Sequence, residues 1–356
     1  MPEATPKYVQ VQKHIEREIR EKNIVGRLPG ERAIAKELGF SYMTVRKAID
    51  NLVVEGALYK IPTKGTFVAD QKRQGKKTRT IGYFLDSGID AGISSPYYSL
   101  IFNALEKEAA KNGYSLVYFS DSSEKNMRET LKKLDGVIAT CFPRVEHVIQ
   151  QIKESVPVVV IDNSSYDKGI PSIIIENFSA DVESVDYVCS LGHTRVGFMT
   201  GLEDSDVGKS RYAGYQRGLA KNNIDLDEAL IYRGDYSYEA GMQGVEYFFS
   251  LDAPPTAIIC ANDSMALGAM RRVHLAKLSV PEDISIVGFD DVVIASQISP
   301  ALTTVAAPVD EIATRSFSML SRLIQGDALE SNHIALEARL VVRDTCAKLL
   351  KTSAAA

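Results

Sequence analysis

Apolar residues recur every three or four positions in three short segments near the start of the chain. This spacing is typical of a helix with one buried face. Gly39 follows the second segment and Gly56 the third, and glycine commonly ends a helix. We therefore predict three amphipathic helices, the third capped by Ser41. The apolar positions are Tyr8, Val11, Ile15 and Ile19, then Ile34, Ala35 and Leu38, then Val45, Ala48, Ile49, Leu52 and Val53.

The stretch ALYKIPTKGTFVA, residues 57–69, alternates apolar and polar positions on either side of Pro62 and Gly65. Alternation favours a strand with one buried face, and proline and glycine favour a turn. The stretch therefore predicts two short strands joined by a turn. Three helices followed by a β-hairpin predict a winged helix-turn-helix over residues 1–69.

The third predicted helix has a second face, which carries hydroxyl groups and cations. Such side chains bond phosphates and reach base edges when a helix lies in a major groove of DNA. Arg32 begins the second helix as a candidate phosphate contact, and Lys64 and Gly65 lie at the turn of the hairpin, where they could enter a groove. One such cation alone is more typical of a solvated surface, but their combined placement favours DNA binding. The candidates on the third helix are Ser41, Tyr42, Thr44, Arg46 and Lys47.

Charge is unevenly distributed along the chain. Residues 1–79 contain 17 Lys and Arg against 9 Asp and Glu, and the rest contains 24 against 37. A basic module joined to an acidic body is expected when one part meets a polyanion. The alternative, a solvated basic tail, requires disorder, which the helical periodicity does not indicate. Residues 70–80, DQKRQGKKTRT, have no apolar residue and predict a flexible linker rather than a docking helix.

Residues 28–69, LPGERAIAKELGFSYMTVRKAIDNLVVEGALYKIPTKGTFVA, resemble the GntR family of bacterial regulators across the whole domain. Two positions depart from the family pattern: Gly30 stands where a capping Ser is common, and Tyr42 stands where an Arg is common. The second departure bears on base specificity, because tyrosine cannot make a bidentate contact to guanine. The resemblance implies DNA contacts at Arg32, Ser41, Tyr42, Thr44, Arg46, Lys64 and Gly65.

From residue 81, short apolar runs alternate with segments of helical periodicity. Runs such as IGYFL and VPVVVID are apolar throughout, as in strands covered on both faces, and SMALGAMRRVHLAKL has the period of a helix. The alternation predicts an α/β body with parallel sheets wound with helices on both faces. We expect two similar lobes with a ligand cleft between them over residues 81–346, which also supply the dimer contacts, followed by a tail at 347–356.

Polar residues follow the predicted strands at their carboxyl ends, where ligands bind in open α/β sheets. Asp162 ends VVVID, Asn262 follows AIICA and Asp290 follows IVGF. Carboxylates, amides and the guanidinium of Arg211 can bond neighbouring hydroxyl groups, and tyrosine rings can pack on a sugar. Asn262 and Asp263 also precede a predicted helix, so N-capping is an equal alternative for them. The tyrosines concerned are Tyr97, Tyr98 and Tyr236.

Residues 80–346 resemble the effector-binding body of the LacI family, which shares the periplasmic sugar-binding fold. Motifs in family order include LGHTRVGFMTG, SRYAGYQRGL, PPTAIICANDSMALGAM and VPEDISIVGFDD. In that family a hinge helix whose leucines enter the minor groove joins head to body, and residues 70–80 contain no leucine. A GntR-type head on a LacI-type body resembles the arabinose-repressor subgroup of GntR regulators. The resemblance implies effector contacts at Tyr97, Tyr98, Asp162, Arg211, Tyr236, Asn262 and Asp290.

Sequence motifs of enzymes are not found. Six residues separate Gly201 from Gly208 in GLEDSDVGKS, whereas a phosphate loop needs four. IGYFLDSGIDAG lacks the GxGxxG spacing of a dinucleotide site, and neither GxSxG nor HExxH occurs. The widely spaced cysteines form no CxxC pair and predict buried thiols rather than metal ligands. We therefore expect no catalysis, no cofactor and no metal.

Together these features predict a repressor that releases operator DNA when a small carbohydrate binds in the cleft. A homodimer is expected, because pseudo-palindromic operators mirror a two-fold axis. An activator, or a co-repressor-type regulator that responds to a nucleoside or another ligand, uses the same parts and stays an alternative. The sequence shows no export signal and no apolar run that could cross a bilayer, so we expect a cytoplasmic protein without a membrane partner.

Overall fold

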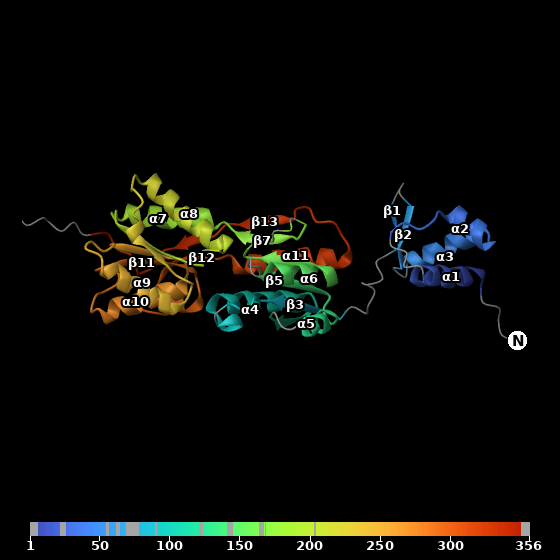
Figure 1. Cartoon of the computed structure of the whole chain (residues 1–356), viewed down its shortest axis with the longest axis horizontal. Coiled ribbons are helices and arrows are strands. Elements are labelled where there is room, and N and C mark those ends of the chain that lie inside the picture. Colours follow the sequence, from blue (N-terminus) through green and yellow to red (C-terminus); the bar gives the residue numbers. More distant parts are fainter. Residues whose placement is uncertain are drawn as a thin grey trace, which may run out of the picture. The chain divides into compact units, whose positions relative to one another are not determined.

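The chain separates into two compact units, residues 1–78 and 79–356 (Figure 1). Each has its own apolar core and is described by itself. The linker and the other domain limits stay predictions, because residues 69–77 lie outside the described part of the chain. The computed structural model describes residues 6–21, 26–54, 57–61, 65–68, 78–89, 91–120, 124–140, 145–163, 167, 169–202 and 204–349.

The first unit has the order of elements that the sequence predicted, which confirms a winged helix-turn-helix. Gly39 ends the second helix in the left-handed conformation at φ 69°, which glycine adopts without steric cost. The hydroxyl of Ser41 accepts a hydrogen bond from the N–H of Thr44 at 3.2 Å and so caps the third helix. The elements are α1 Lys7–Glu21, α2 Glu31–Leu38, α3 Tyr42–Val54, and the antiparallel strands β1 Leu58–Ile61 and β2 Gly65–Val68.

The apolar faces of the three helices pack together and against the hairpin. Val11 and Ile15 of α1 are buried with Val45 and Ile49 of α3 and with Leu58 of β1. These positions repeat the three-and-four spacing of the sequence, so the periodicity located the core of this unit. Because α3 uses its apolar stripe for packing, its polar face stays at the surface.

The second unit consists of two lobes, and lobe 1 is built on a six-stranded parallel sheet in the order β13-β7-β6-β5-β3-β4. Every residue of its strand β5 is buried, as expected for a sheet covered on both faces. The elements of lobe 1 are β3 Thr80–Phe84, α4 Pro96–Lys111, β4 Ser115–Phe119, α5 Glu124–Leu131, β5 Gly136–Thr140, α6 Glu146–Ser155, β6 Val158–Ile161, β7 Ser172–Ile175, α11 Val309–Gln325 and β13 His333–Leu336.

Lobe 2 contains the other six-stranded sheet, in the order β14-β12-β11-β10-β8-β9. Its strands are parallel except β14, which pairs with β12 in the antiparallel direction, a feature that the sequence did not predict. Its elements are α7 Asn177–Ser190, β8 Val196–Thr200, α8 Asp206–Lys221, β9 Ile231–Arg233, α9 Tyr238–Phe249, β10 Ala257–Cys260, α10 Asp263–Leu275, β11 Ser285–Asp290, β12 Thr303–Ala306 and β14 Arg339–Val341. Three short 3-10 helices also lie among the described residues of this unit: Gly92–Ser94, Glu228–Leu230 and Val293–Ser296.

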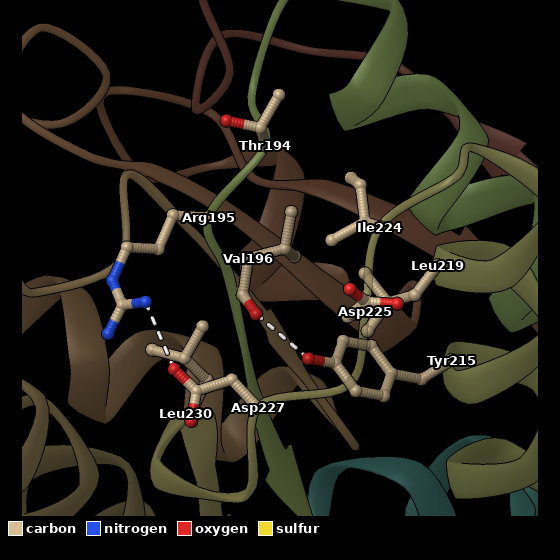
Figure 2. Close-up of a pocket in the computed structure, with 9 residues that line it drawn as sticks. All are labelled: Thr194, Arg195, Val196, Tyr215, Leu219, Ile224, Asp225, Asp227 and Leu230. Atoms are coloured by element: carbon tan, nitrogen blue, oxygen red, sulfur yellow. Dashed lines mark hydrogen bonds and ion pairs between the residues drawn. The ribbon is translucent and has the colours of Figure 1, made fainter.

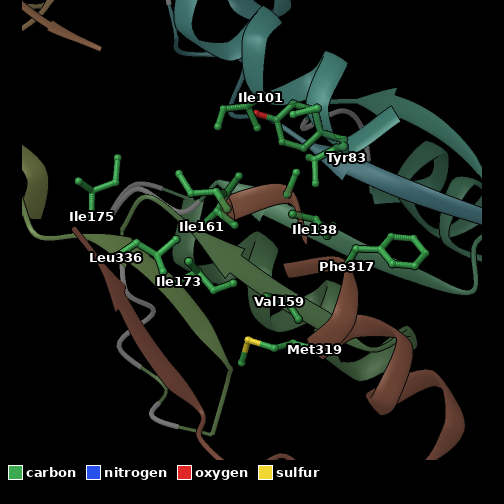
Figure 3. Close-up of a cluster of buried hydrophobic side chains, with 14 of the residues drawn as sticks. Tyr83, Ile101, Ile138, Val159, Ile161, Ile173, Ile175, Phe317, Met319 and Leu336 are labelled. Atoms are coloured by element: carbon green, nitrogen blue, oxygen red, sulfur yellow. The ribbon is translucent and has the colours of Figure 1, made fainter. Parts of the chain in front are cut away.

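Helices cover both faces of each sheet. In lobe 1, Ile101 of α4 and Phe317 of α11 pack on one face with Tyr83 and Val159 of the strands, as Figure 3 shows. Helices α5 and α6 cover the other face. In lobe 2, α7 and α8 cover one face and α9 and α10 the other. The predicted α/β architecture with parallel sheets is thereby confirmed.

The chain crosses between the lobes after β7, after β12 and after β13. Three segments of the chain therefore connect the lobes, and strands of both lobes end near the boundary between them. Among the described residues, no helix is both long and apolar enough to span a membrane. Their acidic, histidine and cysteine side chains form no cluster of metal-binding type.

Candidate DNA interface and effector site

The polar face of α3 carries side chains that were predicted to contact DNA. Tyr42 and Arg46, one helical turn apart, are both exposed, Tyr42 by 39%. The Nε atom of Arg46 is 4.0 Å from Oδ2 of Asp50, the outer limit of an ion pair, so its guanidinium stays available to an anion. The hydroxyls of Ser41 and Thr44 lie 2.8 Å apart and bond each other at the start of the helix. Of these four predicted contacts, Tyr42 and Arg46 are exposed on the helix, and Ser41 and Thr44 already bond each other; their contact with DNA stays a prediction.

Two further predicted contacts lie beside this face. Lys47 turns toward α1, where its Nζ atom lies 4.5 Å from the centre of the Tyr8 ring, a cation–π distance. Arg32 is exposed in the first turn of α2. Gly30 precedes this helix and supplies no side-chain cap. The N–H groups of Ala33 and Ile34 donate to the carbonyl of Gly30, so a phosphate at this turn would meet mainly the side chain of Arg32.

The ammonium group of Lys60, on strand β1, ties the hairpin to both helices of the helix-turn-helix. It donates to Oε1 of Glu31 at 2.9 Å and to Oδ1 of Asp50 at 2.7 Å. The hydrogen bond to Asp50 raises the pKa of Lys60, and so does the hydrogen bond to Glu31. Burial opposes this shift. Because Asp50 also lies beside Arg46, one network connects the hairpin to the exposed face of α3.

Arg27 is an exposed cation at the hairpin that the sequence did not single out. Its backbone forms an antiparallel bridge with Phe67, and its side chain lies over Gly65. A Cβ atom at Gly65 would come within 2.9 Å of Nε of Arg27, and φ there is +116°. The positive φ favours glycine at this turn, whereas the exposed side chain of Arg27 could move away from a Cβ atom. Lys64, the other predicted contact here, lies outside the described residues.

Side chains from both lobes come together at the carboxyl ends of their strands. In lobe 1, the hydroxyl of Tyr97 donates to Oδ1 of Asp162 at 2.6 Å, and the Tyr98 ring lies edge-on to Tyr97 at 5.2 Å. Between the lobes, the N–H of Val207 in α8 donates to Oδ1 of Asn163 at 3.4 Å. We call the following group the inter-lobe site: Tyr97, Tyr98, Asp162, Asn163, Asn177, Asp181, Arg211, Tyr236, Asn262 and Asp290.

Arg211, on α8, is the best-held side chain of the inter-lobe site and only 4% exposed. Its Nε atom donates to Oδ1 of Asn177 at 2.8 Å, and its Nη1 atom donates to the carbonyl of Ala261. Its Nη2 atom is 3.8 Å from Oδ1 of Asp290, and its guanidinium lies 3.4 Å from the centre of the Phe289 ring. The guanidinium is therefore oriented before any ligand arrives.

Three buried carboxyl groups surround this guanidinium. Burial raises the pKa of Asp162 to about 6, against the hydrogen bond from Tyr97 and the charge of Arg211. Burial also raises the pKa of Asp181 to about 7 and that of Asp290 well above its usual range, and Arg211 opposes both shifts. The group holds more acidic than basic side chains, so hydrogen-bond donors from a ligand would stabilise it.

Several buried polar atoms here have no hydrogen-bond partner among the described residues. They are Oδ2 of Asp162, Nδ2 of Asn163, Oδ2 of Asp181 and, at the neighbouring core, the hydroxyl of Tyr83 (Figure 3). Each such atom costs about 1–3 kcal/mol of stability. Native proteins keep unsatisfied groups where a ligand, an ion or water meets them, so their concentration here indicates a binding site.

Asn262 fulfils the capping alternative that its sequence position left open. Its Oδ1 atom accepts from the N–H of Met265 at 2.9 Å, which caps α10, and its Nδ2 atom donates to the carbonyl of Tyr236 at 3.0 Å. Tyr236 has φ 72°, and its ring lies where a Cβ atom at Gly201 would be. Both polar atoms of the amide are engaged, so Asn262 holds Tyr236 in place.

Three members of the inter-lobe site were missed from the sequence: Asn163, Asn177 and Asp181. Asn163 directly follows the predicted Asp162. Asn177 and Asp181 are one turn apart on α7 and are buried in the same stripe as Val185 and Val188. Polar residues at core positions of an amphipathic helix were the available signal.

A separate hollow of about 260 Å³ lies at the amino end of β8, so it is remote along that strand from the inter-lobe site (Figure 2). The hydroxyl of Tyr215 donates to the carbonyl of Val196 at 2.8 Å, and Nη1 of Arg195 lies 3.0 Å from Oδ2 of Asp227. These polar groups are already paired with one another, so they do not indicate a ligand site. The lining residues are Thr194, Arg195, Val196, Tyr215, Leu219, Ile224, Asp225, Asp227 and Leu230.

Comparisons with known proteins agree with both units. Residues 7–68 match the gntR family of bacterial regulatory proteins, and residues 185–346 match the periplasmic binding protein-like domain. The HTH-type transcriptional repressor CytR of Escherichia coli K12 is 32% identical over 260 residues, which cover 70% of this chain and 76% of CytR.

Solved structures of LacI-family regulators have the same fold. A regulatory protein of the LacI family from Chloroflexus aggregans is 25% identical, covers 76% of this chain and 99% of its own, and has a TM-score of 0.64. A LacI family regulator from Enterococcus faecium with bound ribose, 24% identical, covers 76% of this chain and 100% of its own at a TM-score of 0.68. This chain therefore belongs to the bacterial transcription regulators that join a gntR-family DNA-binding domain to a periplasmic-binding-protein-like domain of the LacI kind.

Proposed function

We propose that this regulator is a repressor whose affinity for operator DNA falls when a small carbohydrate binds the inter-lobe site. One observation carries the proposal: a basic winged helix-turn-helix is joined to a body whose buried polar atoms lack partners. CytR, its relative, is a repressor, and a protein of the same fold has been solved with ribose. Both facts support a repressor that responds to a sugar.

The DNA contacts we propose are those that the sequence predicted. Tyr42 and Arg46 meet base edges in the major groove, while the start of α2 and the hairpin meet the backbone. Arg27 joins them, because its exposed guanidinium lies over Gly65 at the hairpin. The proposed set is Arg27, Arg32, Ser41, Tyr42, Thr44, Arg46, Lys47, Lys64 and Gly65.

The effector contacts we propose lie in the inter-lobe site. Hydroxyl groups of a sugar donate to Asp162 and Asp290 and accept from Arg211, while Tyr97 and Tyr98 pack against its C–H face. Tyr236 closes the opposite side, held there by Asn262. Tyrosine rings also suit a nucleobase, so nucleosides belong in any search for the effector.

We propose that the protein acts as a homodimer, with two heads on a pseudo-palindromic operator. Effector binding changes DNA affinity only through its differential binding to two states of the dimer, and a tenfold change needs about 1.4 kcal/mol. A monomer at micromolar concentration, with and without operator, would contradict this arrangement. The same proposal places the protein with DNA in the cytoplasm and assigns it no catalysis.

The test selects the operator first. Full-length protein is used to enrich duplexes from a random library, and the affinity for the enriched duplex is measured by fluorescence anisotropy. Sugars, polyols and nucleosides are then added one at a time. We expect a two-fold symmetric motif and at least one compound that weakens binding; failure to enrich any motif would refute the DNA-binding role.

A further inference from the structure

The inter-lobe site has an excess of buried acid. Asp162, Asp181 and Asp290 are 7%, 1% and 6% exposed, and the cation described among them is Arg211. That guanidinium already bonds Asn177 and the carbonyl of Ala261 and lies 3.8 Å from Asp290. Three of its five N–H groups have no described hydrogen bond, so Arg211 can still donate to a ligand, but it is a single cation among three buried carboxyl groups.

Asp181 stands out among the three because no hydrogen bond or ion pair is described for its carboxyl group. It projects from α7 toward α8, where a Cβ atom at Gly214 would meet its own Cβ atom at 2.9 Å. Two titratable groups interact electrostatically with the carboxyl group of Asp181: Arg211 of α8 and Tyr236. A buried carboxyl group without a partner lowers the stability of the fold.

The unsatisfied atoms also determine which hydrogen bonds a ligand would have to make. Oδ2 of Asp162 and Oδ2 of Asp181 are acceptors, whereas Nδ2 of Asn163 is a donor. When both carboxyl groups are ionised, a ligand that completes these hydrogen bonds donates at two places and accepts at one. Hydroxyl groups do both, an amine donates, and a phosphate or carboxylate group can only accept at neutral pH.

We propose that the inter-lobe site selects a hydroxyl- or amine-bearing ligand without negative charge, rejects its phosphorylated or carboxylated counterpart, and uses Asp181 as a ligand contact. This inference deepens the proposed function and rests on it. At pH 8, above the pKa values of about 6 for Asp162 and about 7 for Asp181, an added anion would meet two ionised carboxylates in a buried setting, where charges interact more strongly than in water. A neutral sugar can donate to the unsatisfied oxygens of Asp162 and Asp181 and accept from Nδ2 of Asn163 without this repulsion.

The first test needs no knowledge of the ligand. A residue kept for binding, not for folding, leaves the protein more stable when an isostere replaces it. In the full chain at pH 8, Asp181→Asn is expected to raise the melting temperature by about 2–4 °C, since it removes a buried charge and keeps the shape. Because burial raises the pKa of Asp181 to about 7, this gain should shrink as pH falls toward 4.

Asp186→Asn is the matched control on the same helix. Its carboxylate bonds Lys221 and the amide of Asn222, so the substitution removes partners and should leave the melting temperature unchanged or lower. If Asp181→Asn also leaves the melting temperature unchanged or lowers it at pH 8, Asp181 is part of the packing and the inference is wrong.

The second test compares matched ligands by their shift of the melting temperature of the full chain. The pairs are D-ribose with D-ribose 5-phosphate, and D-glucose and D-glucosamine with D-glucuronate. We expect any shift to come from the uncharged or amine member, and to require at least tenfold more ligand in Asp181→Asn. A larger shift by an anionic member overturns the inference but leaves a carbohydrate effector in place. If none of these compounds shifts the melting temperature, the selectivity inference fails together with the carbohydrate effector on which it rests.

Discussion

Two arginines that we propose as ligand contacts, one for DNA and one for the effector, have different surroundings. Arg46 lies exposed on α3, 4.0 Å from an exposed carboxylate. Arg211 is buried, with two hydrogen-bond acceptors, a nearby carboxylate and an aromatic ring around it. A DNA-binding surface works with solvated cations that release counterions from the phosphates. A small-ligand site instead fixes its polar groups in advance and leaves some unsatisfied until the ligand binds.

The contrast extends to stability. An exposed cation such as Arg46, with only a 4.0 Å approach to Asp50, can change with little effect on the fold. The inter-lobe site combines a charge that the fold needs with carboxyl groups that weaken it. Substitutions in the two regions should therefore separate binding from stability in different ways.

Arg211→Ala should have the largest effect. It leaves Asp290 and Asn177 without their partner in a buried setting, and we expect it to lower the free energy of unfolding by about 3–5 kcal/mol. Urea unfolding of the full chain, followed by tyrosine fluorescence because the protein has no Trp, measures this loss. Arg272→Ala is the control, since Arg272 lies 3.8 Å from the exposed Glu246 and should cost at most about 1 kcal/mol. Equal losses in both variants would contradict a special role for Arg211.

Arg46→Ala should have the opposite profile. We expect affinity for the selected duplex to fall by about 5- to 150-fold, the effect of losing one base contact worth about 1–3 kcal/mol. Its free energy of unfolding should stay within about 0.5 kcal/mol of the wild type, because the side chain is exposed. Lys111→Ala removes an exposed cation of the body and should leave DNA affinity unchanged. A loss of stability in Arg46→Ala large enough to explain the weaker DNA binding would contradict the view that Arg46 contributes to binding and not to folding.

Lys60→Met tests a third kind of cation, one that holds the hairpin against α2 and α3. Methionine keeps the apolar stem but loses the bonds to Glu31 and Asp50 that hold the hairpin to α2 and α3. We expect affinity for the selected duplex to fall about threefold to tenfold, with a stability loss of about 1 kcal/mol or less. Lys132→Met, which removes a surface pair with Glu129, is the control. Unchanged DNA affinity in Lys60→Met would mean that the hairpin needs no such tie.

The smallest effect is expected for Lys64→Ala, at the turn of the hairpin. If Lys64 meets a phosphate, its loss weakens binding mildly and lowers the slope of log affinity against log salt by about one unit. Anisotropy titrations between 50 and 200 mM salt, about the range in which such slopes are large, give this value. A weaker affinity with an unchanged slope would assign Lys64 a contact other than a phosphate.

Much of the fold could be predicted because both periodicities are strong. The three-and-four spacing located the helices of the first unit, and Gly39 ends α2 as predicted. Apolar runs such as VPVVVID became buried parallel strands. Strand β14 was missed because its residues alternate only briefly, and its antiparallel pairing with β12 depends on a chain crossing that leaves no local pattern.

The inter-lobe site was predicted in outline. Motifs located Asp162, Arg211 and Asp290, whereas Asp181 has no motif and is recognised by its burial without a partner. Arg27 lies far in sequence from Gly65, so their proximity needed the folded hairpin. Sequence spacing shows which residues share a face of a helix or strand. Whether a buried polar atom has a hydrogen-bond partner depends on side chains from distant elements.

The central claim is that a ligand in the inter-lobe site controls DNA binding by the first unit. Its most direct test is the anisotropy of the selected duplex with full-length wild type and Asp290→Ala, each with and without the sugar found in the screen. We predict at least a tenfold loss of DNA affinity on adding sugar to the wild type, equal affinity of both proteins without sugar, and no response in the variant. A wild type whose affinity is unchanged by a sugar that binds it, or a variant that still responds, would contradict the claim.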